Sequence, residues 1–336
     1  MSLRRKLWLV SMAVFAAMGL ASMARSGETP PIIKVGIIGL DAHAVPWTQI
    51  IHSPEAKAPI NEMRIVAAYP SFSPDVPFSK DNIEKNTATL RDLGVEICDS
   101  IEKMLSKVDA VLLLSIDGRP HLEQARAVFA ARKPVFIDKP VASSLAEIVQ
   151  IFDEAEKTGT PCFSNSSLRY SPGIASMRSD PEVGAVLGCD SYSNSVSILP
   201  GHPDLFYYGI HGTEALFTIM GPGCETVTRV NTPTADLAIG TWKDGRMGTF
   251  RGIKKGQVGF GAMVFGDKGI KPSGQFGGYE PLLVEIVKFF RTGKAPMSVE
   301  QTLEIYAFLE GADISQREGG KPVSLQSVLE NARKPK

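Results

Sequence analysis

The chain has 336 residues, 43% of them hydrophobic, and its 36 basic residues are balanced by 36 acidic ones. This length and apolar content suffice for a large core and predict two domains. The balanced charge argues against nucleic acid or an anionic surface as a partner.

The first 24 residues have the pattern of an export signal peptide. Arg4, Arg5 and Lys6 precede an apolar stretch over residues 7–18, and residues 22–24 (Ser-Met-Ala) offer a small-x-small cleavage site. We therefore expect an exported protein, periplasmic or extracellular, that keeps no stable membrane span after cleavage. An N-terminal membrane anchor is the alternative, for which the apolar run is short.

Short apolar strands alternate with helical stretches from residue 31 to about residue 160, which predicts a parallel sheet with crossover helices. The expected strands are residues 32–38, 64–69, 95–98, 110–115 and 135–137, and the expected helices are residues 44–52, 101–106, 122–131 and 145–157. We predict a Rossmann-like nucleotide-binding domain over residues 31–160.

The turn after the first strand has the placement of a dinucleotide-binding fingerprint but lacks its second glycine. In the pattern G-x-G-x-x-G/A, Gly39 and Ala44 fit the first and third places, and Asp41 stands at the second. A carboxylate there occupies the space that a pyrophosphate needs; alternatively, Asp41 is the N-cap of the helix that follows. The acidic residue that takes the ribose hydroxyls is also missing, because no Asp or Glu lies between Glu62 and Asp75.

From residue 161 onward, strands follow one another closely with Gly-rich turns. They are expected at residues 184–198, 226–230, 236–242, 247–251 and 259–265, with helices near 205–220 and 280–292 and a helical tail from residue 299. This predicts an α+β domain over residues 161–336 with a mostly antiparallel open sheet, and an α/β fold class overall. The exposed sheet face would suit a homo-oligomer, although about half of its candidate residues should face the helices: Leu237, Ala238, Ile239, Val258 and Val264.

Five local strings carry further information. They are Pro-His-Leu at residues 120–122, Val-Phe-Ile-Asp-Lys-Pro at 135–140, Ser-Leu-Arg-Tyr-Ser-Pro at 167–172, Gly-Ile-His-Gly-Thr-Glu at 209–214, and a closing pattern over 299–323. In this order and spacing they resemble the glucose–fructose oxidoreductase, inositol dehydrogenase and MocA family (Gfo/Idh/MocA). The resemblance covers nearly all of residues 32–330. It implies a Rossmann domain that holds NAD or NADP and an α/β domain that presents a sugar or polyol over it.

The resemblance implies that Lys139 and His211 are catalytic. Lys139 would hydrogen-bond the reacting hydroxyl, and His211 would move a proton on or off it, since imidazole titrates near neutrality. Tyr207, a third catalytic candidate, stands where active dehydrogenases of the family carry an Asp that partners the histidine. In a helix over residues 204–218, Tyr207, His211 and Glu214 share one face, so Glu214 could orient the ring instead.

Other candidates follow from the same resemblance and from residue type. Cofactor contacts are expected at Gly39, Asp41, Ala44, Ser115, His121 and Asp138. Substrate contacts are expected at Arg169, Tyr170 and Glu214. His202, Asp204, His211 and Glu214 have side chains that suit a divalent ion, but dispersed residues of this kind are common by chance, and we predict no metal site. Alternatively, His121, Lys139 and Arg169 are ordinary surface residues and His211 is a packed core histidine.

The leading interpretation is an exported, NAD(P)-dependent oxidoreductase of this family that acts on a sugar or polyol. The departures at the cofactor site leave two alternatives open. One is a cofactor-independent sugar lyase or hydrolase that uses His211 as its base, with Lys139, Tyr207 or a bound metal to stabilise charge. The other is a non-catalytic carbohydrate-binding protein on the same fold.

Overall fold

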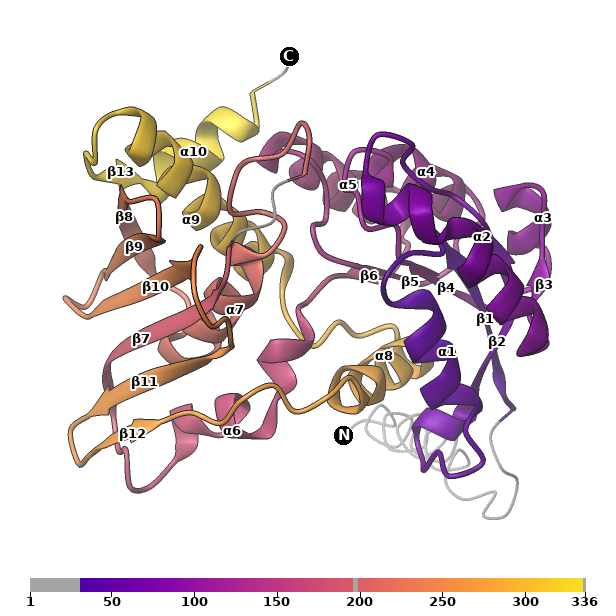
Figure 1. The fold of residues 1–336 in the computed structure, drawn as a ribbon, viewed down its shortest axis with the longest axis horizontal. Coiled ribbons are helices and arrows are strands. Elements are labelled where there is room, and N and C mark those ends of the chain that lie inside the picture. The colour runs from indigo at the N-terminus through magenta and orange to yellow at the C-terminus, as the bar shows by residue number, and fades with distance from the viewer. Residues whose placement is uncertain (1–30, 196–198, 335–336) are drawn as a thin grey trace, which may run out of the picture. The chain divides into compact units, whose positions relative to one another are not determined.

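The computed structural model describes residues 31–195 and 199–334. From Ile33 onward the chain forms one compact unit, and two sheets dominate it (Figure 1). The expected signal peptide, residues 1–24, lies outside the described residues. The domain boundary expected near residue 160 stays a prediction. Over the ranges described, no helix is both long and apolar enough to cross a membrane.

The first sheet is parallel throughout and has the strand order β3-β2-β1-β4-β5-β6. Its strands are β1 (Ile33–Ile38), β2 (Met63–Tyr69), β3 (Glu96–Ile97), β4 (Ala110–Leu113), β5 (Val135–Ile137) and β6 (Cys162–Phe163). The strand order reverses between β1 and β4, and ligands of such sheets bind outside the carboxyl ends of the strands at this point. The predicted Rossmann-type sheet is confirmed.

Helices cover both faces of the first sheet (Figure 1). One face packs against α1 (Ala44–His52), α2 (Pro77–Asp92) and α8 (Glu280–Thr292), and the other against α3 (Ile101–Leu105), α4 (His121–Ala130) and α5 (Leu145–Thr158). Helix α8 comes from the C-terminal half of the chain, yet its apolar stripe is buried against the first sheet through Leu282, Leu283, Ile286, Val287 and Phe289.

The sequence does not predict α2, because this helix lacks an apolar stripe. Of its 16 residues only Ser79 and Leu90 are buried, so the periodicity that marks an amphipathic helix is absent. The available signal is Pro77 in its first turn, a position where proline is favoured because its missing N–H would have no partner there in any case.

The second sheet has the order β12-β11-β7-β10-β9-β8-β13 and is antiparallel except for the β7–β10 pair. Its strands are β7 (Val186–Asn194), β8 (Cys224–Asn231), β9 (Ala235–Trp242), β10 (Met247–Ile253), β11 (Gly261–Gly266), β12 (Ile270–Pro272) and β13 (Val323–Ser324). Helices α7 (Gly209–Met220), α9 (Val299–Arg317) and α10 (Leu325–Ala332) pack against it. The predicted second sheet, mostly antiparallel, is confirmed.

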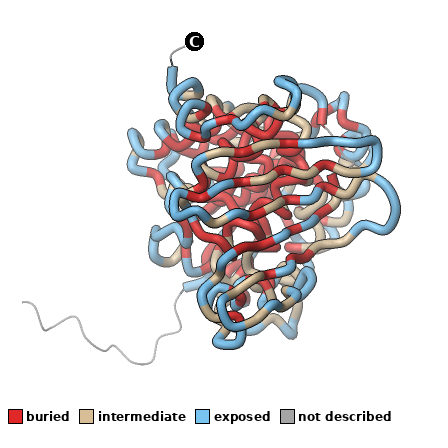
Figure 2. Tube along the Cα trace, turned by 90° about the vertical axis from the view of Figure 1, so that its left-hand side faces the viewer, coloured by how far each residue is buried: buried red, intermediate tan, exposed pale blue. Residues whose placement is uncertain are grey.

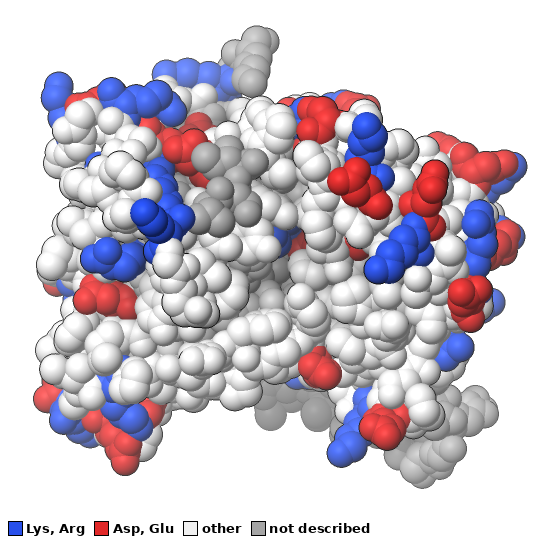
Figure 3. All heavy atoms as spheres, in the orientation of Figure 1, with Lys and Arg blue, Asp and Glu red and all other residues white. Residues whose placement is uncertain are grey.

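The other face of the second sheet is open (Figure 2). It carries exposed apolar side chains, among them Leu187, Met247 and Ile270. Of the residues expected there, Ala238 and Val264 are fully buried instead, while Val258 is exposed. On the face shown in Figure 3, charged side chains of both signs are mixed, mainly toward the edges. That distribution agrees with the balanced charge of the sequence.

Helix α7 lies very close to strand β10, and glycine makes this approach possible. A Cβ atom on Gly212 would lie 2.4 Å from Cε2 of Phe250, which is fully buried on β10. Real Cβ atoms do not approach ring carbons this closely, so only glycine fits without displacing the helix. This contact fixes the height of α7 over the sheet and therefore the position of its neighbour His211.

We expect Gly212→Ala to destabilise the protein by about 1–3 kcal/mol, the usual cost of overpacking, despite the higher helix propensity of alanine. Urea unfolding measures this change. The matched control is Gly259→Ala, whose Cβ would meet only Tyr192 Cε2 at 3.9 Å and whose effect should stay within about 0.5 kcal/mol. Equal effects of the two substitutions would contradict the tight α7–β10 contact.

Candidate functional site

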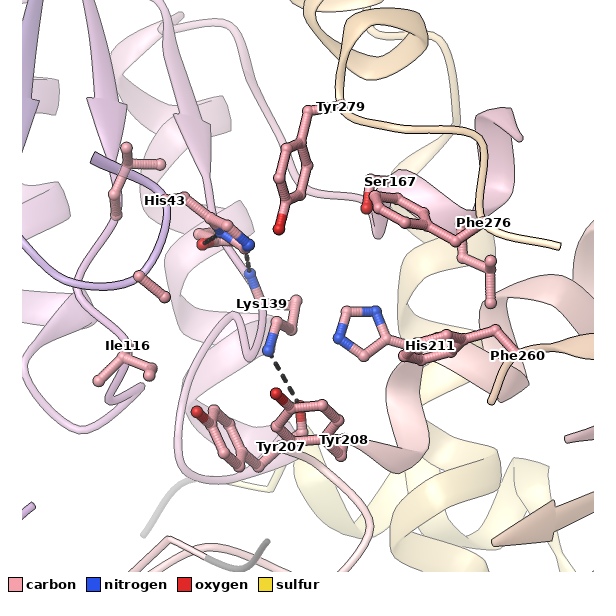
Figure 4. Close-up of a pocket in the computed structure, with 14 residues that line it drawn as sticks. His43, Ile116, Lys139, Ser167, Tyr207, Tyr208, His211, Phe260, Phe276 and Tyr279 are labelled. Carbon is pink, nitrogen blue, oxygen red and sulfur yellow. Dashed lines mark hydrogen bonds and ion pairs between the residues drawn. The ribbon is translucent and has the colours of Figure 1, made fainter. Parts of the chain in front are cut away.

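A pocket of about 260 Å³ lies at the carboxyl ends of β1, β4 and β5, opposite the start of α7. Its lining combines aromatic rings with a few polar groups (Figure 4): Tyr207, Tyr208, Phe260, Phe276 and Tyr279 with His43, Asp138, Lys139, Ser167 and His211. This is the edge at which parallel sheets of this class bind ligands. The three residues predicted to be catalytic, Lys139, His211 and Tyr207, are therefore brought together.

Lys139 follows strand β5 and is buried, with 7% of its surface exposed. Its Nζ donates a hydrogen bond of 3.3 Å to the carbonyl oxygen of Tyr207 and lies 4.4 Å and 4.9 Å from the ring centroids of Tyr207 and Tyr208. Burial lowers the pKa of Lys139 to about 8, because an ammonium loses hydration there. The solvated-surface interpretation of this lysine is wrong.

Asp138 is committed to His43, a residue that the sequence analysis does not single out. Its Oδ2 lies in direct contact with His43 Nδ1, and its Oδ1 accepts a hydrogen bond of 2.8 Å from the backbone N–H of Lys139. Burial alone would raise the pKa of Asp138, but the neighbouring His43 and Lys139 hold it below its ordinary value. The imidazole of His43 also stacks on Trp47, with 5.0 Å between ring centroids.

The Asp138–His43 contact joins the turn after β1 to the end of β5 across the crevice. His43 occupies a variable place in the fingerprint, so residue type alone gave no reason to select it. The only available signal was that the position before Ala44 lies at the start of a helix facing the crevice. As a result, the carboxylate of Asp138 is already paired with His43 where it lines the pocket.

His211 lies in the first turn of α7, and its Nδ1 is 2.6 Å from Ser166 Oγ. Burial, followed by the nearby charges of Lys139 and His43, lowers its pKa well below the ordinary value, so the ring is neutral at physiological pH. Because α7 begins at Gly209, Tyr207 precedes the helix and does not share a helical face with His211. The predicted helix over residues 204–218 starts too early.

Glu214 pairs with Arg169 and with the backbone of Ser166, and not with His211 itself. Its Oε2 accepts a hydrogen bond of 2.5 Å from Arg169 Nε, and its Oε1 accepts one of 3.3 Å from the backbone N–H of Ser166. Tyr170 donates to Asn165 Oδ1 at 2.5 Å. The predicted substrate residues Arg169, Tyr170 and Glu214 are thus absent from the pocket lining. Of the three, Glu214 binds the backbone N–H of Ser166, whose hydroxyl contacts His211.

The fingerprint turn keeps its first glycine for a clear reason. Gly39 has a φ of 85°, and a Cβ there would lie 2.4 Å from the backbone nitrogen of Ser115. Ala44 is fully buried against the sheet, as the third position requires. Ser115 donates its hydroxyl to Gln124 at 3.0 Å. Both ring nitrogens of the buried His121 face carbonyl oxygens, of Val141 and of Ser115, so this histidine is a structural bridge and is not exposed to solvent.

Asp41 is buried at the fingerprint turn and does not cap α1. It is 2% exposed, and its Oδ2 accepts a hydrogen bond of 2.9 Å from the backbone N–H of Ile116, in the loop after β4. The N-cap of α1 is His43, with no side-chain cap, so the capping interpretation is wrong. Because Asp41 is buried away from water, its pKa is raised.

An apolar cluster closes the groove beside Asp41. Buried side chains from the loops after β2 and β4 meet side chains from the segment before α7: Val76, Ile116, Leu199 and Tyr207, with Ala42 and Tyr208 packed against them. A dinucleotide would extend from the fingerprint turn toward the end of β2, and it would lie between the loops after β2 and β4.

Charged side chains fasten the same two loops together. Arg119 donates to both carboxylate oxygens of Asp75 at 2.7 Å and also to Asp117, while Ser73 donates to Asp117 at 2.6 Å. Burial alone would raise the pKa of Asp117, but the hydrogen bonds from Arg119 and Ser73 hold it below its ordinary value. Arg119 is therefore already neutralised by two carboxylates.

These residues do not fit a dinucleotide. Asp41 places a buried carboxylate at the pyrophosphate position, the apolar cluster packs between the loops beside it, and Arg119 of these loops is paired. The end of β2, Tyr69 followed by Pro70, has no acid for the ribose hydroxyls. A pyrophosphate would bring negative charge next to Asp41 and Asp117, and Arg119 is already paired with two carboxylates.

The residues considered as metal ligands are not gathered. His202 accepts a hydrogen bond from the backbone N–H of Gly118, Asp204 pairs with Arg229, and Glu214 pairs with Arg169. In the part of the chain that the structure describes, no group of three or more His, Cys, Asp or Glu side chains is placed to hold a metal ion.

The burial of Lys139 predicts a pH-dependent stability. Its pKa is about 8 in the folded state and 10.5 as the ordinary value, so between these two pH values the unfolded chain binds more protons and stability rises with pH. We expect the unfolding free energy of the wild type, relative to Lys139→Met, to rise by up to about 3 kcal/mol from pH 8 to pH 10.5. Urea unfolding across this range measures it. A constant difference would contradict a buried ammonium.

The N-terminal part of the chain matches a known family. Residues 33–166 match the Gfo/Idh/MocA model, described as an oxidoreductase family with an NAD-binding Rossmann fold. None of the curated proteins matches the sequence.

Several solved structures share the fold. An oxidoreductase from Agrobacterium radiobacter in complex with NAD+, L-tartaric acid and magnesium has a TM-score of 0.70 and 15% identity, over 88% of this chain and 99% of that one. Myo-inositol dehydrogenase from Lactobacillus casei, in complex with NAD(H) and myo-inositol, has a TM-score of 0.69 and 15% identity, over 87% and 96%. Scyllo-inositol dehydrogenase from the same organism has a TM-score of 0.68 and 16% identity, over 88% and 99%. Over residues 33–166 the chain matches the Gfo/Idh/MocA family that its sequence resembles, and over most of its length it shares the fold of these solved structures.

Proposed function

We propose that the protein is an enzyme that converts a sugar or polyol in the pocket between β5 and α7, with Lys139 and His211 as its proton-transfer groups. The observation that carries this proposal is their placement: a buried lysine and a neutral histidine line one pocket of about 260 Å³. Inositol dehydrogenases share the fold, which supports a polyhydroxylated substrate.

The two groups have different roles. The Lys139 ammonium is a hydrogen-bond donor and stabilises negative charge that develops on a substrate oxygen. His211 has its Nδ1 held by Ser166, so its Nε2 is the nitrogen left to face the pocket, and the ring faces Lys139 across the cavity (Figure 4). Since its pKa lies well below the ordinary value, His211 begins the reaction neutral and is able to accept a proton.

The reaction class follows from the cofactor groove. Because the residues there do not fit a dinucleotide, we propose chemistry that needs an acid and a base but no electron acceptor. Cleavage of a C–O bond in a sugar derivative, by elimination or hydrolysis, meets this condition.

Hydride transfer with NAD or NADP is the second candidate. The observations that favour it are the family model over residues 33–166 and the preserved Gly39 turn, whose positive φ and contact with Ser115 match the fingerprint. It requires the loops after β2 and β4 to separate and Asp41 to leave its bond with Ile116.

We also propose that the protein is exported and forms homo-oligomers. The charge and apolar pattern of residues 1–24 supports export, and an exported enzyme would meet little free dinucleotide. The exposed apolar residues on the open sheet face, such as Leu187 and Met247, support association between copies.

We expect turnover of a sugar or polyol without added cofactor, and a loss of about 10²–10⁴ in kcat for His211→Ala, the usual contribution of a general base. Product formation from a panel of sugars, sugar acids and polyols, followed by NMR, measures this. Ligand affinity should change little. The matched control is His52→Gln, at the end of α1 and outside the pocket lining, which should keep the wild-type kcat. Unchanged turnover in His211→Ala would contradict the proposal.

A further inference from the structure

Lys139 carries a buried positive charge that no carboxylate of the described residues balances directly. Within residues 31–195 and 199–334, its Nζ donates one hydrogen bond, to the carbonyl oxygen of Tyr207 at 3.3 Å, and it lies over the rings of Tyr207 and Tyr208. A carbonyl and two rings stabilise an ammonium only in part, because none of them carries a full negative charge. The ammonium therefore lines the pocket with no carboxylate of the described residues in hydrogen-bond contact.

The nearest carboxylates are engaged elsewhere. Asp138 contacts His43 and the backbone N–H of Lys139. Glu214 lies outside the pocket lining and pairs with Arg169. Tyr207 stands beside Lys139 with an uncharged phenol, since burial raises its pKa. Burial of a charge without a partner is costly, and an anionic ligand would remove that cost by supplying the partner.

The other side chains that line the pocket indicate what the uncharged part of such a ligand is. Tyr208, Phe260 and Phe276 offer flat apolar faces, while His211, Ser167 and Tyr279 offer polar groups at the rim of the same cavity (Figure 4). The volume, about 260 Å³, lies just below the range of about 300–1,000 Å³ of drug-sized ligand sites. A single monosaccharide with an apolar ring face and several hydroxyls suits this combination.

We propose that the ligand of this pocket is a sugar acid, whose carboxylate binds Lys139 Nζ while its hydroxyls reach His211 and Tyr279. This inference rests on the proposed function and names its substrate class. A carboxylate is favoured over a phosphate because the pocket offers one cation with two N–H donors to spare, whereas a dianion is usually held by several cationic or backbone donors.

The test compares D-glucuronate with D-glucose by isothermal titration calorimetry on the full mature chain at pH 7. The two sugars differ only in the carboxylate. We expect glucuronate to bind at least tenfold more tightly, and Lys139→Met to abolish this preference. The control Lys288→Met removes an exposed lysine of α8 and should keep the preference. Lys139→Gln gives a second variant, and both variants are first checked for a cooperative thermal transition.

The pH dependence of ligand affinity gives a second test. A purely structural role for Lys139 would not make glucuronate affinity depend on pH. The free site loses its charge above the Lys139 pKa of about 8, so glucuronate affinity should fall by up to about tenfold per pH unit between pH 8.5 and 9.5, while glucose affinity stays constant. His211 is already neutral in this range, and burial raises the pKa values of Tyr207 and Tyr279.

The outcomes separate the two proposals. Equal affinities for glucuronate and glucose, or a preference that survives in Lys139→Met, overturn the sugar-acid assignment while leaving the proposed function intact. Tighter binding of glucose 6-phosphate than of glucuronate also overturns it, in favour of a phosphorylated sugar. If none of these sugars binds and none is turned over, the proposed function fails together with the assignment.

Discussion

The rest of the site depends on one contact, in which the loops after β2 and β4 close against the segment before α7. Val76, Ile116 and Tyr207 are buried together there, and Arg119 fastens the loops through Asp75 and Asp117. Tyr207 belongs both to this apolar cluster and to the wall of the pocket. The packing of Tyr207 therefore both closes the groove and forms one wall of the pocket. A dinucleotide could enter only by dissolving the cluster that holds the pocket wall in place.

The buried ammonium of Lys139 lowers the stability of the folded protein but supplies a cation for a ligand in the pocket. The ammonium is buried, which disfavours its charged form, and it is kept in place by a backbone carbonyl and two aromatic rings. Active sites commonly retain such unfavourable groups because a ligand completes them. His211 is the complementary case. Burial and the charge of Lys139 keep it neutral, so one pocket contains a donor and an acceptor of protons.

Much of the fold follows from the sequence alone, since short apolar runs and 3.6-residue periodicity mark most strands and helices of both sheets. The exceptions have physical causes. Helix α2 buries almost no side chains, and α7 begins at Gly209 and not near residue 204, because helix boundaries depend on local turns that periodicity does not encode. The sequence resemblance predicts Lys139, Tyr207 and His211 at the site, but the Asp138–His43 and Glu214–Arg169 pairs join residues 95 and 45 positions apart. Pairing across such separations is set by the tertiary fold.

In this account, the loops after β2 and β4 close the dinucleotide groove. A measurement of dinucleotide binding tests this closure most directly. The measurement is a calorimetric titration of the mature chain with NAD(H) and NADP(H), after the purified protein has been examined for bound nucleotide. The account predicts no copurified nucleotide and no binding at about 1 mM, an affinity weaker than about −4 kcal/mol. Micromolar binding, or nucleotide that copurifies, would contradict it. That result would show that Asp41 and the apolar cluster give way to a cofactor.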